Sequence, residues 1–368
     1  MRIVHVAPHQ QARAATRLSV ARELATAQAK ANGGMVQLVA AAPEPRQSRS
    51  ELEEHFFALD RPHCLGRSRA LRQHLLRSPL EIVHAHCLGE RALHYARLAA
   101  ERNGAPLVIS PAGAFGLGAR ERLHPRCALQ RIFIHTQALE HAAGWHATST
   151  EEAAAIQAAG FRQPICVAPP GVRAPGAAGL AEARAWWRQR HPVLAERPVA
   201  LCCASVACSA GAFAALALWS RLATRGWVLL IVADSPALTA RLAAAAAKHD
   251  GAGHILVTPA GEHPPHAAAN VFLLPETKGC AVCPVAEALA AGLPVLTTDD
   301  HPWARLAADR AGWCVPRAAL EHTLARVLET PVDALAPLSR NARELAEREF
   351  NWARSAELLL AFYRNLRG

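Results

Sequence analysis

The sequence predicts an α/β protein of two domains, each built on a doubly wound parallel sheet. Short apolar runs, of the kind that form strands buried on both faces, alternate along the chain with helix-forming segments. At 368 residues the chain is long enough for two or three domains. Its longest apolar stretches, such as 229–233, fall far short of the roughly 20 residues that a membrane-spanning helix needs.

Apolar runs bounded by proline, glycine or polar residues predict the strands of the first half of the chain. Residues 43–80 hold acidic and basic clusters with proline and serine, which we interpret as a helical connection. A helix is expected after His146-Ala-Thr-Ser149, where Ser149 or Thr150 could be the N-cap, with Glu152 in the first turn. The other expected elements are strands at Arg2–Ala7, Met35–Ala40, Glu81–His86 and Pro106–Ser110, and a helix around Leu18–Ala29.

The second half continues the alternation after a linker. Residues 175–179 are rich in proline, glycine and alanine, so we place the domain boundary near 175–185. Beyond it we expect strands at Val199–Cys203 and Trp227–Ala233 and a helix at Leu238–Lys248.

A strand, a helix and a second strand are clearest between residues 270 and 299. Val271–Leu274 is a short apolar run suited to a buried strand, and a proline ends it. Pro284 fits the first turn of a helix, where its missing N–H costs nothing. Gly292 stops that helix, and Val295–Thr298 is the second strand. Ligands of parallel sheets lie outside the carboxyl ends of the strands, so the loop before Pro284 and the helix start form a candidate ligand site.

This segment resembles a known site. Pro284-Val-Ala-Glu287-Ala and Ala291-Gly292-Leu-Pro-Val295 are similar to the nucleotide-sugar site of retaining GT-B glycosyltransferases of family four. The resemblance covers nearly the whole chain and implies the GT-B fold, in which two Rossmann-like domains face each other across a cleft. Further segments that resemble the family are Glu81-Ile-Val-His84-Ala-His86, Ser110-Pro-Ala-Gly113 and the stretch from Gly160 to Val172.

The resemblance gives each domain a role. Residues 1–178 would form the acceptor-side domain, and residues 179–351 the nucleotide-sugar-binding domain. The helix at 352–368 would cross back and pack on the first domain. Its apolar residues at helical spacing are expected in a core, and they are Leu358, Phe362 and Leu366.

On the donor side, the resemblance places Glu287 on the nucleotide ribose, in a helix that begins with Pro284 and Val285. The family's sugar-binding glutamate falls on Gly279. Its two diphosphate-binding cations are also missing, because Ala204-Ser205 and Ala210 stand at their positions. Hydroxyl groups, loop N–H groups and other charges would substitute. The residues that offer them are Ser205, Ser209, Gly211, Lys278 and, from the first domain, Arg13, while Glu276 could present its carboxylate to the sugar.

On the acceptor side, the resemblance directs attention to His86, at the carboxyl end of its strand. A substrate contact or a catalytic role beside Glu276 is one interpretation, and a structural histidine is the other. The family often has a histidine two residues after Ser110, where this chain has alanine. Ser110, Gly113 and Arg13 complete the residues expected on this side.

The resemblance implies transfer of a sugar from a nucleotide donor to a cell-envelope glycan or lipid-linked acceptor, with retention and without a metal or other cofactor. Because half of the donor signature is missing, a catalytically lapsed relative that acts as a partner or stabiliser of an active glycosyltransferase is the alternative. A metal site at Cys208, Cys280 and Cys283 has weaker support, since a single Cys-x-x-Cys lacks histidine partners at a set spacing.

Composition bounds the location and the partners. Ten scattered cysteines without an export signal indicate reduced core thiols, and we expect a cytoplasmic protein, free or peripheral at the inner face of the membrane. Most of the net charge of +10 lies in residues 1–175, where 21 Arg and Lys stand against 13 Asp and Glu. Such a surface attracts phosphates or is simply solvated. No basic run with interleaved aromatic residues is present, so we expect no nucleic-acid partner.

Overall fold

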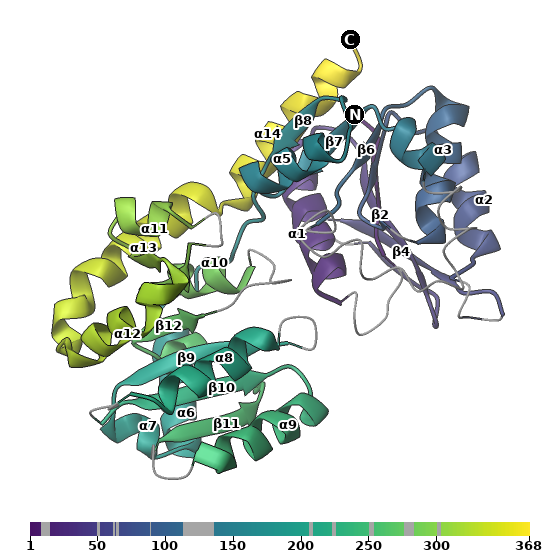
Figure 1. Cartoon of the computed structure of the whole chain (residues 1–368). Helices are drawn as coiled ribbons and strands as arrows, with labels where there is room; N and C mark the ends of the chain where they lie inside the picture. Colours follow the sequence, from purple (N-terminus) through teal and green to yellow (C-terminus); the bar gives the residue numbers. More distant parts are fainter. Residues whose placement is uncertain are drawn as a thin grey trace. The chain divides into compact units, whose positions relative to one another are not determined.

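The computed structural model describes the chain apart from residues 9–14, 50–51, 62, 64–65, 89, 113–135, 206–208, 223–225, 250–253, 276–282 and 300–302. The described residues divide into two compact units (Figure 1). Unit 1 comprises Met1–Gly171 together with Asn351–Gly368, and unit 2 comprises Val172–Phe350. Each unit has its own sheet and its own cores.

Unit 1 is an eight-stranded sheet in the order β3-β4-β2-β1-β5-β6-β7-β8. Its neighbouring strands are parallel, except that β3 is antiparallel to β4. The strands are β1 (Ile3–Val6), β2 (Val36–Ala42), β3 (Arg46–Arg49), β4 (Glu53–Ala58), β5 (Ile82–Ala85), β6 (Leu107–Ile109), β7 (Gly144–Ala147) and β8 (Ile165–Val167). The helices are α1 (Ala15–Ala31), α2 (Arg69–Arg77), α3 (Arg91–Asn103), α5 (Thr150–Ala158) and α14 (Trp352–Leu366).

The strand order of unit 1 reverses next to β1. Strands β2 and β4 extend the sheet on one side of β1, whereas β5 to β8 extend it on the other. The pairing of β1 with β5 aligns His5 with His84. Ligands of open α/β sheets bind at such a reversal, outside the carboxyl ends of the strands. The carboxyl ends of β1 and β5 are therefore the position in unit 1 where the topology favours a site.

The expected helical connection at 43–80 is wrong in its first part, because β3 and β4 occupy it. Their side chains pair with one another and with β2 instead of forming an apolar run. The guanidinium of Arg46 lies 4.3 Å from the centre of the Phe56 ring, and Gln37 donates a 2.8 Å hydrogen bond to Glu53. Cross-strand pairs of this kind stabilise polar strands at a sheet edge, so the hydrophobic pattern did not reveal them.

Helices cover both faces of the sheet of unit 1 (Figure 1), and an apolar cluster lies beneath them on each face. Helices α2 and α3 pack on one face, against Val4, Val6 and Val83 among others. Helices α1 and α14 pack on the opposite face, against Ile3 and Ile82. Successive residues of a strand point to opposite faces, so the histidines between these valines and isoleucines point toward α1 and α14.

Helix α14 approaches the sheet closely because glycine lies beneath it. A Cβ added at Gly144 would lie 2.5 Å from the Phe362 ring, and one added at Gly171 would lie 2.4 Å from the backbone nitrogen of Trp352. The small residues therefore allow the last helix of the chain to pack on unit 1.

The buried stripe of α14 differs from the one expected. Leu358 is 41% exposed, so its assignment to a core is wrong. Phe362 and Leu366 do pack against the cluster beneath α1 and α14. The stripe is centred one position further along the helix, because the fully packed residues are Ser355, Ala356, Leu359, Leu360 and Tyr363.

Unit 2 is a six-stranded parallel sheet in the order β11-β10-β9-β12-β13-β14. Its strands are β9 (Val199–Ala204), β10 (Val228–Ala233), β11 (Ile255–Pro259), β12 (Val271–Leu274), β13 (Val295–Thr298) and β14 (Gly312–Val315). Its α-helices are α6 (Ala177–Arg190), α7 (Val193–Glu196), α8 (Ala210–Trp219), α9 (Pro236–Ala246), α10 (Cys283–Ala290), α11 (Arg305–Ala308), α12 (Leu320–Glu329) and α13 (Ala336–Glu349). Short 3₁₀ turns are η5 (Ala247–His249), η6 (Pro265–Ala268), η7 (Arg317–Ala319) and η8 (Val332–Leu335).

The strand order of unit 2 reverses between β9 and β12, since β10 and β11 extend one side and β13 and β14 the other. The predicted strand, helix and strand before residue 300 are confirmed as β12, α10 and β13. Gly292 ends α10 with φ of 80°, and the N–H of Leu293 donates to the carbonyl of Ala288 at 2.9 Å. A left-handed glycine with this bond closes a helix, as the sequence indicated.

The cores of unit 2 are two apolar clusters, one on each face of the sheet. Trp187 and Phe272 belong to one cluster and Trp219 to the other, all fully buried. The described cysteines form no disulfides with one another, and they are Cys87, Cys166, Cys202, Cys203 and Cys314.

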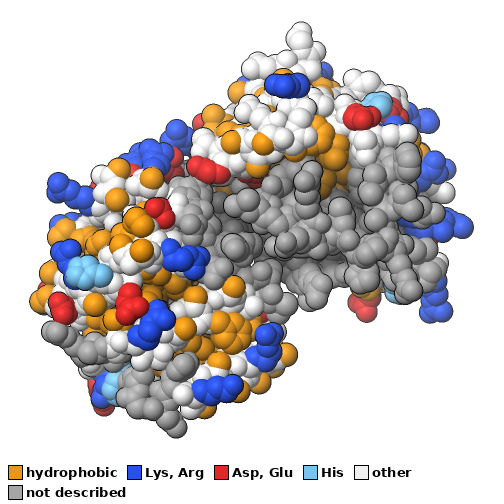
Figure 2. All heavy atoms as spheres, in the orientation of Figure 1, with side chains coloured by type: hydrophobic (Ala, Val, Ile, Leu, Met, Phe, Trp, Pro, Cys, Tyr) orange, Lys and Arg blue, Asp and Glu red, His pale blue; other side chains and the backbone are white. Residues whose placement is uncertain are grey.

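The predicted fold class of two parallel-sheet α/β domains is confirmed. Among the described residues, no helix combines the length and apolarity that crossing a membrane requires. On the face that Figure 2 shows, Lys and Arg side chains are dispersed over the described surface and do not gather in one patch.

Candidate functional site

The carboxyl edge of the unit 2 sheet brings together β9 and α8. Ser205 directly follows β9 and is half-buried. Ser209 occupies the N-cap of α8, with no side-chain cap bond, and Gly211 is buried in the first turn. Three predicted donor-binding residues therefore lie between the end of a strand and the start of a helix, beside the reversal of strand order. Backbone N–H groups at such a helix start are suited to an anion.

Helix α10 supplies the second group at this edge. Val285 is fully buried in a core, and Pro284 is half-buried. Glu287 is exposed, and partial desolvation raises the pKa of its carboxyl above 4.5. Its charge helps burial and Cys202 to raise the pKa of the Cys203 thiol, which places Glu287 near the end of β9. Glu287 thus lies at the switch between β9 and β12.

Five predicted site residues lie outside the described residues: Arg13, Gly113, Glu276, Lys278 and Gly279. Cys208 and Cys280 of the weaker metal hypothesis lie outside them as well. Their roles remain predictions. The described donor-side residues are therefore Ser205, Ser209, Gly211, Pro284, Val285 and Glu287.

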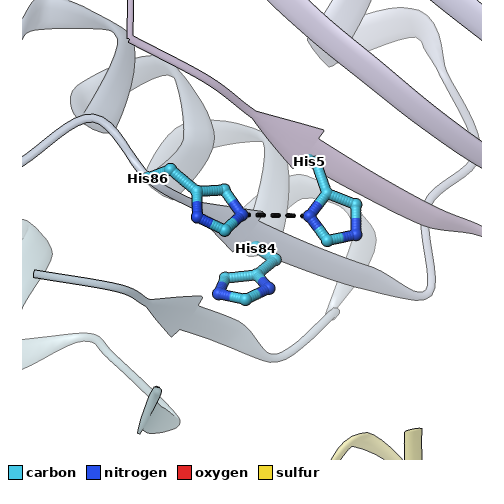
Figure 3. A group of neighbouring side chains, drawn as sticks. All are labelled: His5, His84 and His86. Carbon is cyan, nitrogen blue, oxygen red and sulfur yellow. Dashed lines mark hydrogen bonds between the residues drawn. The ribbon is translucent and has the colours of Figure 1, made fainter. Parts of the chain in front are cut away.

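In unit 1, His86 and Ser110 follow β5 and β6 at the carboxyl edge of the sheet. Both are buried, with 5% and 3% of their surface exposed. The backbone N–H of His86 donates to the carbonyl of Val6 at 2.8 Å, which holds His86 against β1. Its ring meets His5 and His84, whose side chains come from β1 and β5 (Figure 3).

These residues belong to one continuous set of hydrogen bonds, which we call the histidine chain. Its first half runs from His86 to Tyr363. The distances are 3.0 Å from Nε2 of His86 to Nδ1 of His5, 2.8 Å from Nε2 of His5 to Oε1 of Gln28, and 3.2 Å from Nε2 of Gln28 to the hydroxyl of Tyr363.

The second half of the histidine chain runs from Tyr363 to a backbone carbonyl. The distances are 2.6 Å from the Tyr363 hydroxyl to Nδ1 of His84, 2.8 Å from Nε2 of His84 to Oγ of Ser110, 2.5 Å from that Oγ to Nδ1 of His146, and 2.8 Å from Nε2 of His146 to the carbonyl of Ala168. Ser110 is therefore a link in a buried network, with its hydroxyl shared between two imidazoles.

Burial keeps the imidazoles of the histidine chain neutral. Desolvation lowers the pKa of His5 to about 4. Burial, and then the neighbouring imidazoles, hold the pKa values of His84 and His86 well below 6.5, and burial lowers the pKa of His146. At neutral pH each ring therefore has one nitrogen that donates and one that accepts.

Sequence reasoning selected His86 and Ser110 but missed five members of the chain: His5, Gln28, His84, His146 and Tyr363. A signal for part of it was present. His5, His84 and His146 are polar residues inside otherwise apolar strands, at positions that a strand buried on both faces normally fills with Val, Ile or Leu. Gln28 and Tyr363 lie 335 residues apart and meet only in the fold.

A cavity of 370 Å³ in unit 2 is separate from these residues. Asn270 and Leu293 line it, and they precede β12 and β13, so it lies at the amino edge of the sheet. The described predicted site residues do not line it. Its basic lining side chains are Arg184, His266, Arg340 and Arg343.

Comparison with known proteins agrees with this architecture. Residues 18–171 match the family described as a glycosyl transferase 4-like domain. A proposed colanic acid biosynthesis glycosyltransferase of Escherichia coli, WcaL, is 41% identical over 93 residues. That match spans 23% of this chain and 23% of the relative.

Solved structures match over nearly the whole chain. Sucrose-phosphate synthase from Thermosynechococcus elongatus has a TM-score of 0.73 at 16% identity, covering 100% of this chain and 99% of that one. HepE of Anabaena, solved with UDP-glucose, has a TM-score of 0.73 at 12% identity and coverages of 99% and 100%. WaaG, a glycosyltransferase involved in lipopolysaccharide biosynthesis, has a TM-score of 0.68 at 16% identity and coverages of 97% and 99%. Residues 18–171 thus match the glycosyl transferase 4-like family, and the chain as a whole has the GT-B fold of these glycosyltransferases.

Proposed function

We propose that the protein transfers a sugar from a nucleotide-sugar donor to a cell-envelope glycan or lipid-linked acceptor, with retention of anomeric configuration. The observation that carries the proposal is the position of Glu287, an exposed residue with a partly desolvated carboxyl, at the switch point of the unit 2 sheet. A carboxylate there can accept hydrogen bonds from both hydroxyls of a nucleotide ribose. HepE, solved with UDP-glucose, and an Escherichia coli protein solved with UDP-2-fluoro glucose have the same fold.

The diphosphate of the donor would lie beside β9 and α8. The Ser205 and Ser209 hydroxyls and the N–H groups of the first turn of α8 are hydrogen-bond donors of the kind that anions need. Ser205 and Ala210, at the positions of the family's two cations, carry no charge, although preorganised charge is usually the largest contribution to such catalysis. Since losing one charge-stabilising donor typically costs about 10²–10³ in rate, we expect slow turnover unless Lys278 or Arg13 supplies the charge.

The acceptor assignment rests on the relatives. The names of WcaL and WaaG connect those proteins with colanic acid and lipopolysaccharide. A cell-envelope glycan or lipid-linked acceptor is the corresponding proposal for this chain.

Calorimetry with UDP-, GDP- and ADP-glucose tests the donor site. We expect saturable binding of one of them, weakened about tenfold or more in Glu287→Ala, because the carboxylate contacts the ribose directly. Glu196→Ala is a matched control, since Glu196 is also exposed in unit 2 but lies before β9, at the amino edge. Equal weakening by both substitutions would contradict the assignment of Glu287.

Turnover tests the reaction. The donor that binds should release its nucleoside diphosphate slowly when glycan acceptors are supplied, and NMR of the product should show the anomeric configuration of the donor. An inverted product would rule out retention.

A catalytically lapsed relative that stabilises an active glycosyltransferase is the second candidate. The observation in its favour is that the neutral residues Ser205 and Ala210 stand where the family carries cations, together with Gly279 in place of a glutamate. It predicts no calorimetric response to any of the three donors and co-purification with an intact glycosyltransferase. Donor binding that depends on Glu287, followed by turnover, would exclude it.

A further inference from the structure

The direction of every hydrogen bond in the histidine chain follows from its last member. The carbonyl of Ala168 can only accept, so Nε2 of neutral His146 carries the proton and its Nδ1 is an acceptor. The hydroxyl of Ser110 must then donate to that Nδ1, and its oxygen accepts from Nε2 of His84. Nδ1 of His84 is left as an acceptor.

The same reasoning continues to the other end. Tyr363 donates its hydroxyl proton to Nδ1 of His84 and accepts from the amide nitrogen of Gln28. The amide oxygen of Gln28 accepts from Nε2 of His5, whose Nδ1 accepts from Nε2 of His86. All four histidines therefore carry their proton on Nε2, and one backbone carbonyl sets the polarity of the whole set.

Nδ1 of His86 is the open end. Within the part of the chain that the structure describes, this nitrogen has no hydrogen-bond partner. Nε2 of His74 and Nδ1 of His94 also lack a partner and are inaccessible to solvent, whereas Nδ1 of His86 is not among such enclosed nitrogens. His86 directly follows β5, which pairs with β1 at the strand-order reversal of unit 1. An unprotonated imidazole nitrogen is thus placed where the topology favours a ligand.

A metal ion is the competing occupant, because one nitrogen from each of His5, His84 and His86 lies within 4.8 Å of the others. Both ring nitrogens of His5 and both of His84 already have hydrogen-bond partners. Metal binding at these two rings would break the histidine chain at two points and leave buried polar groups without partners, which is costly. The bonding pattern therefore favours an ion-free network.

We propose that the histidine chain fixes His86 in the Nε2–H tautomer, so that its Nδ1 accepts a hydrogen bond from a hydroxyl group of a sugar substrate. This rests on the proposed function, because a sugar transferase binds hydroxyl groups on both its donor and its acceptor. His5, Gln28 and Tyr363 are positioning residues, since they act on the substrate through His86. Tyr363 is the link between the two halves of the histidine chain, and it comes from the last helix.

His86 is a hydrogen-bond acceptor in this arrangement and not a base. A proton taken up at Nδ1 would have to remain on a buried imidazole packed against His5 and His84, with ring centroids 5.3 and 4.1 Å away. Among the described residues the carboxylate that acts on the four imidazoles is Glu152, which acts on His146 at the far end. Within the described ranges no carboxylate acts on His86 to offset a positive charge, so the ring orients a hydroxyl without deprotonating it.

Nitrogen NMR of the full-length protein labelled with ¹⁵N-histidine tests the tautomers, because long-range ¹H–¹⁵N spectra distinguish protonated from unprotonated ring nitrogens. We expect four neutral rings with the proton on Nε2, identified by single His→Asn substitutions. In Tyr363→Phe the amide of Gln28 is free to turn over, so His5 and His86 should populate both tautomers. An Nδ1–H or charged His86 in the wild-type protein would overturn the proposal.

The chain offers a matched control, since Tyr95 and Tyr363 are its two tyrosines and both are buried. Tyr95 belongs to the opposite face of the unit 1 sheet. Tyr95→Phe should leave all four histidine signals in place. Equal effects of the two substitutions, or no effect of Tyr363→Phe, would contradict the role of Tyr363.

Ligand titrations test the open end. UDP-glucose should shift Nδ1 of His86 more than UDP does if the donor sugar makes the contact, whereas maltose should shift it if an acceptor glycan does. A Nδ1 signal that responds to neither sugar would overturn the ligand assignment, and tight binding of one equivalent of Zn²⁺ that His5→Gln abolishes would overturn the ion-free network. These results are separate from the calorimetric test of Glu287, so the proposed function and this inference can fail independently.

Discussion

Units 1 and 2 are both parallel sheets with a reversal of strand order, yet they hold polar groups at that reversal in different ways. Unit 2 presents Ser205, Ser209 and Glu287 on a loop and on helix starts, above two apolar cores. Unit 1 buries a hydrogen-bonded set of side chains within the sheet, and His86 is its outer end.

The difference concerns how a side chain is oriented. The backbone geometry at the start of a helix orients the residues there, so Glu287 needs few hydrogen-bond partners to hold its position. A buried imidazole needs a partner for each nitrogen, because an unpaired buried polar group costs about 1–3 kcal/mol. Unit 1 therefore couples its site to its stability, whereas unit 2 keeps the two largely separate.

Acidification should produce the largest difference in stability between the two units. Among the described residues, four fully packed histidines of unit 1 and one of unit 2, His266, have pKa values below 6.5. A depressed folded pKa means that the stability is complete above about pH 6.5 and falls as the pH decreases toward 4. His5 alone should cost unit 1 about 2 kcal/mol between pH 7 and pH 5.

Hydrogen exchange at the two pH values, corrected for intrinsic rates, reports the units separately. Protection of β1, β5 and α14 should fall much more than protection of β9 and β12. Equal losses in both units would contradict the contrast between a polar and an apolar interior.

The close approach of α14 gives the next largest effect. Gly171→Ala would place a Cβ 2.4 Å from the backbone nitrogen of Trp352, so the helix start must move. We expect about 3 kcal/mol of destabilisation, the upper part of the usual range for overpacking. In unit 2, Gly179→Ala lies in an exposed turn of α6 with open space around it and should be neutral or slightly stabilising. Urea unfolding compares the two variants, and an unchanged Gly171→Ala protein would disprove the close approach.

Removing one hydroxyl from the histidine chain should have a smaller effect. Tyr363→Phe leaves Nδ1 of His84 without a donor and the amide of Gln28 without an acceptor, so we expect a loss of about 2 kcal/mol in the free energy of unfolding. Tyr95→Phe should stay within about 0.5 kcal/mol of the wild-type protein. Thermal and urea unfolding of both variants measure the difference, and similar losses would show that the chain contributes nothing specific.

Removing a helix cap should cause the smallest loss of stability, and the loss should be similar in both units. Ser149 accepts from the N–H of Glu152 at the start of α5, and Ser235 accepts from the N–H of Leu238 at the start of α9. Each Ser→Ala substitution should cost about 1 kcal/mol, because a cap is a local interaction. Urea unfolding that showed a clearly larger loss for one cap would mean that the two units differ even in local interactions.

The local sequence predicted those parts of the site whose positions depend on the backbone geometry of a few neighbouring residues. Pro284 and Gly292 bound α10 as expected, and the position of Glu287 in that helix places it near the end of β9. It failed for β3 and β4, where pairing across strands replaces an apolar pattern. It also misplaced the buried stripe of α14 by about one position, because the apolar residues on both flanks of the stripe look alike in the sequence.

The sequence by itself determined two α/β units, the strand and helix that hold Glu287, and the presence of polar residues inside apolar strands. These follow from hydrophobic periodicity and from the backbone preferences of proline and glycine, which act over a few residues. The tertiary structure alone decided that His5, Gln28, His84 and Tyr363 form one hydrogen-bonded set. Each imidazole can donate from either nitrogen, and only the positions of partners far apart in the sequence determine which one does.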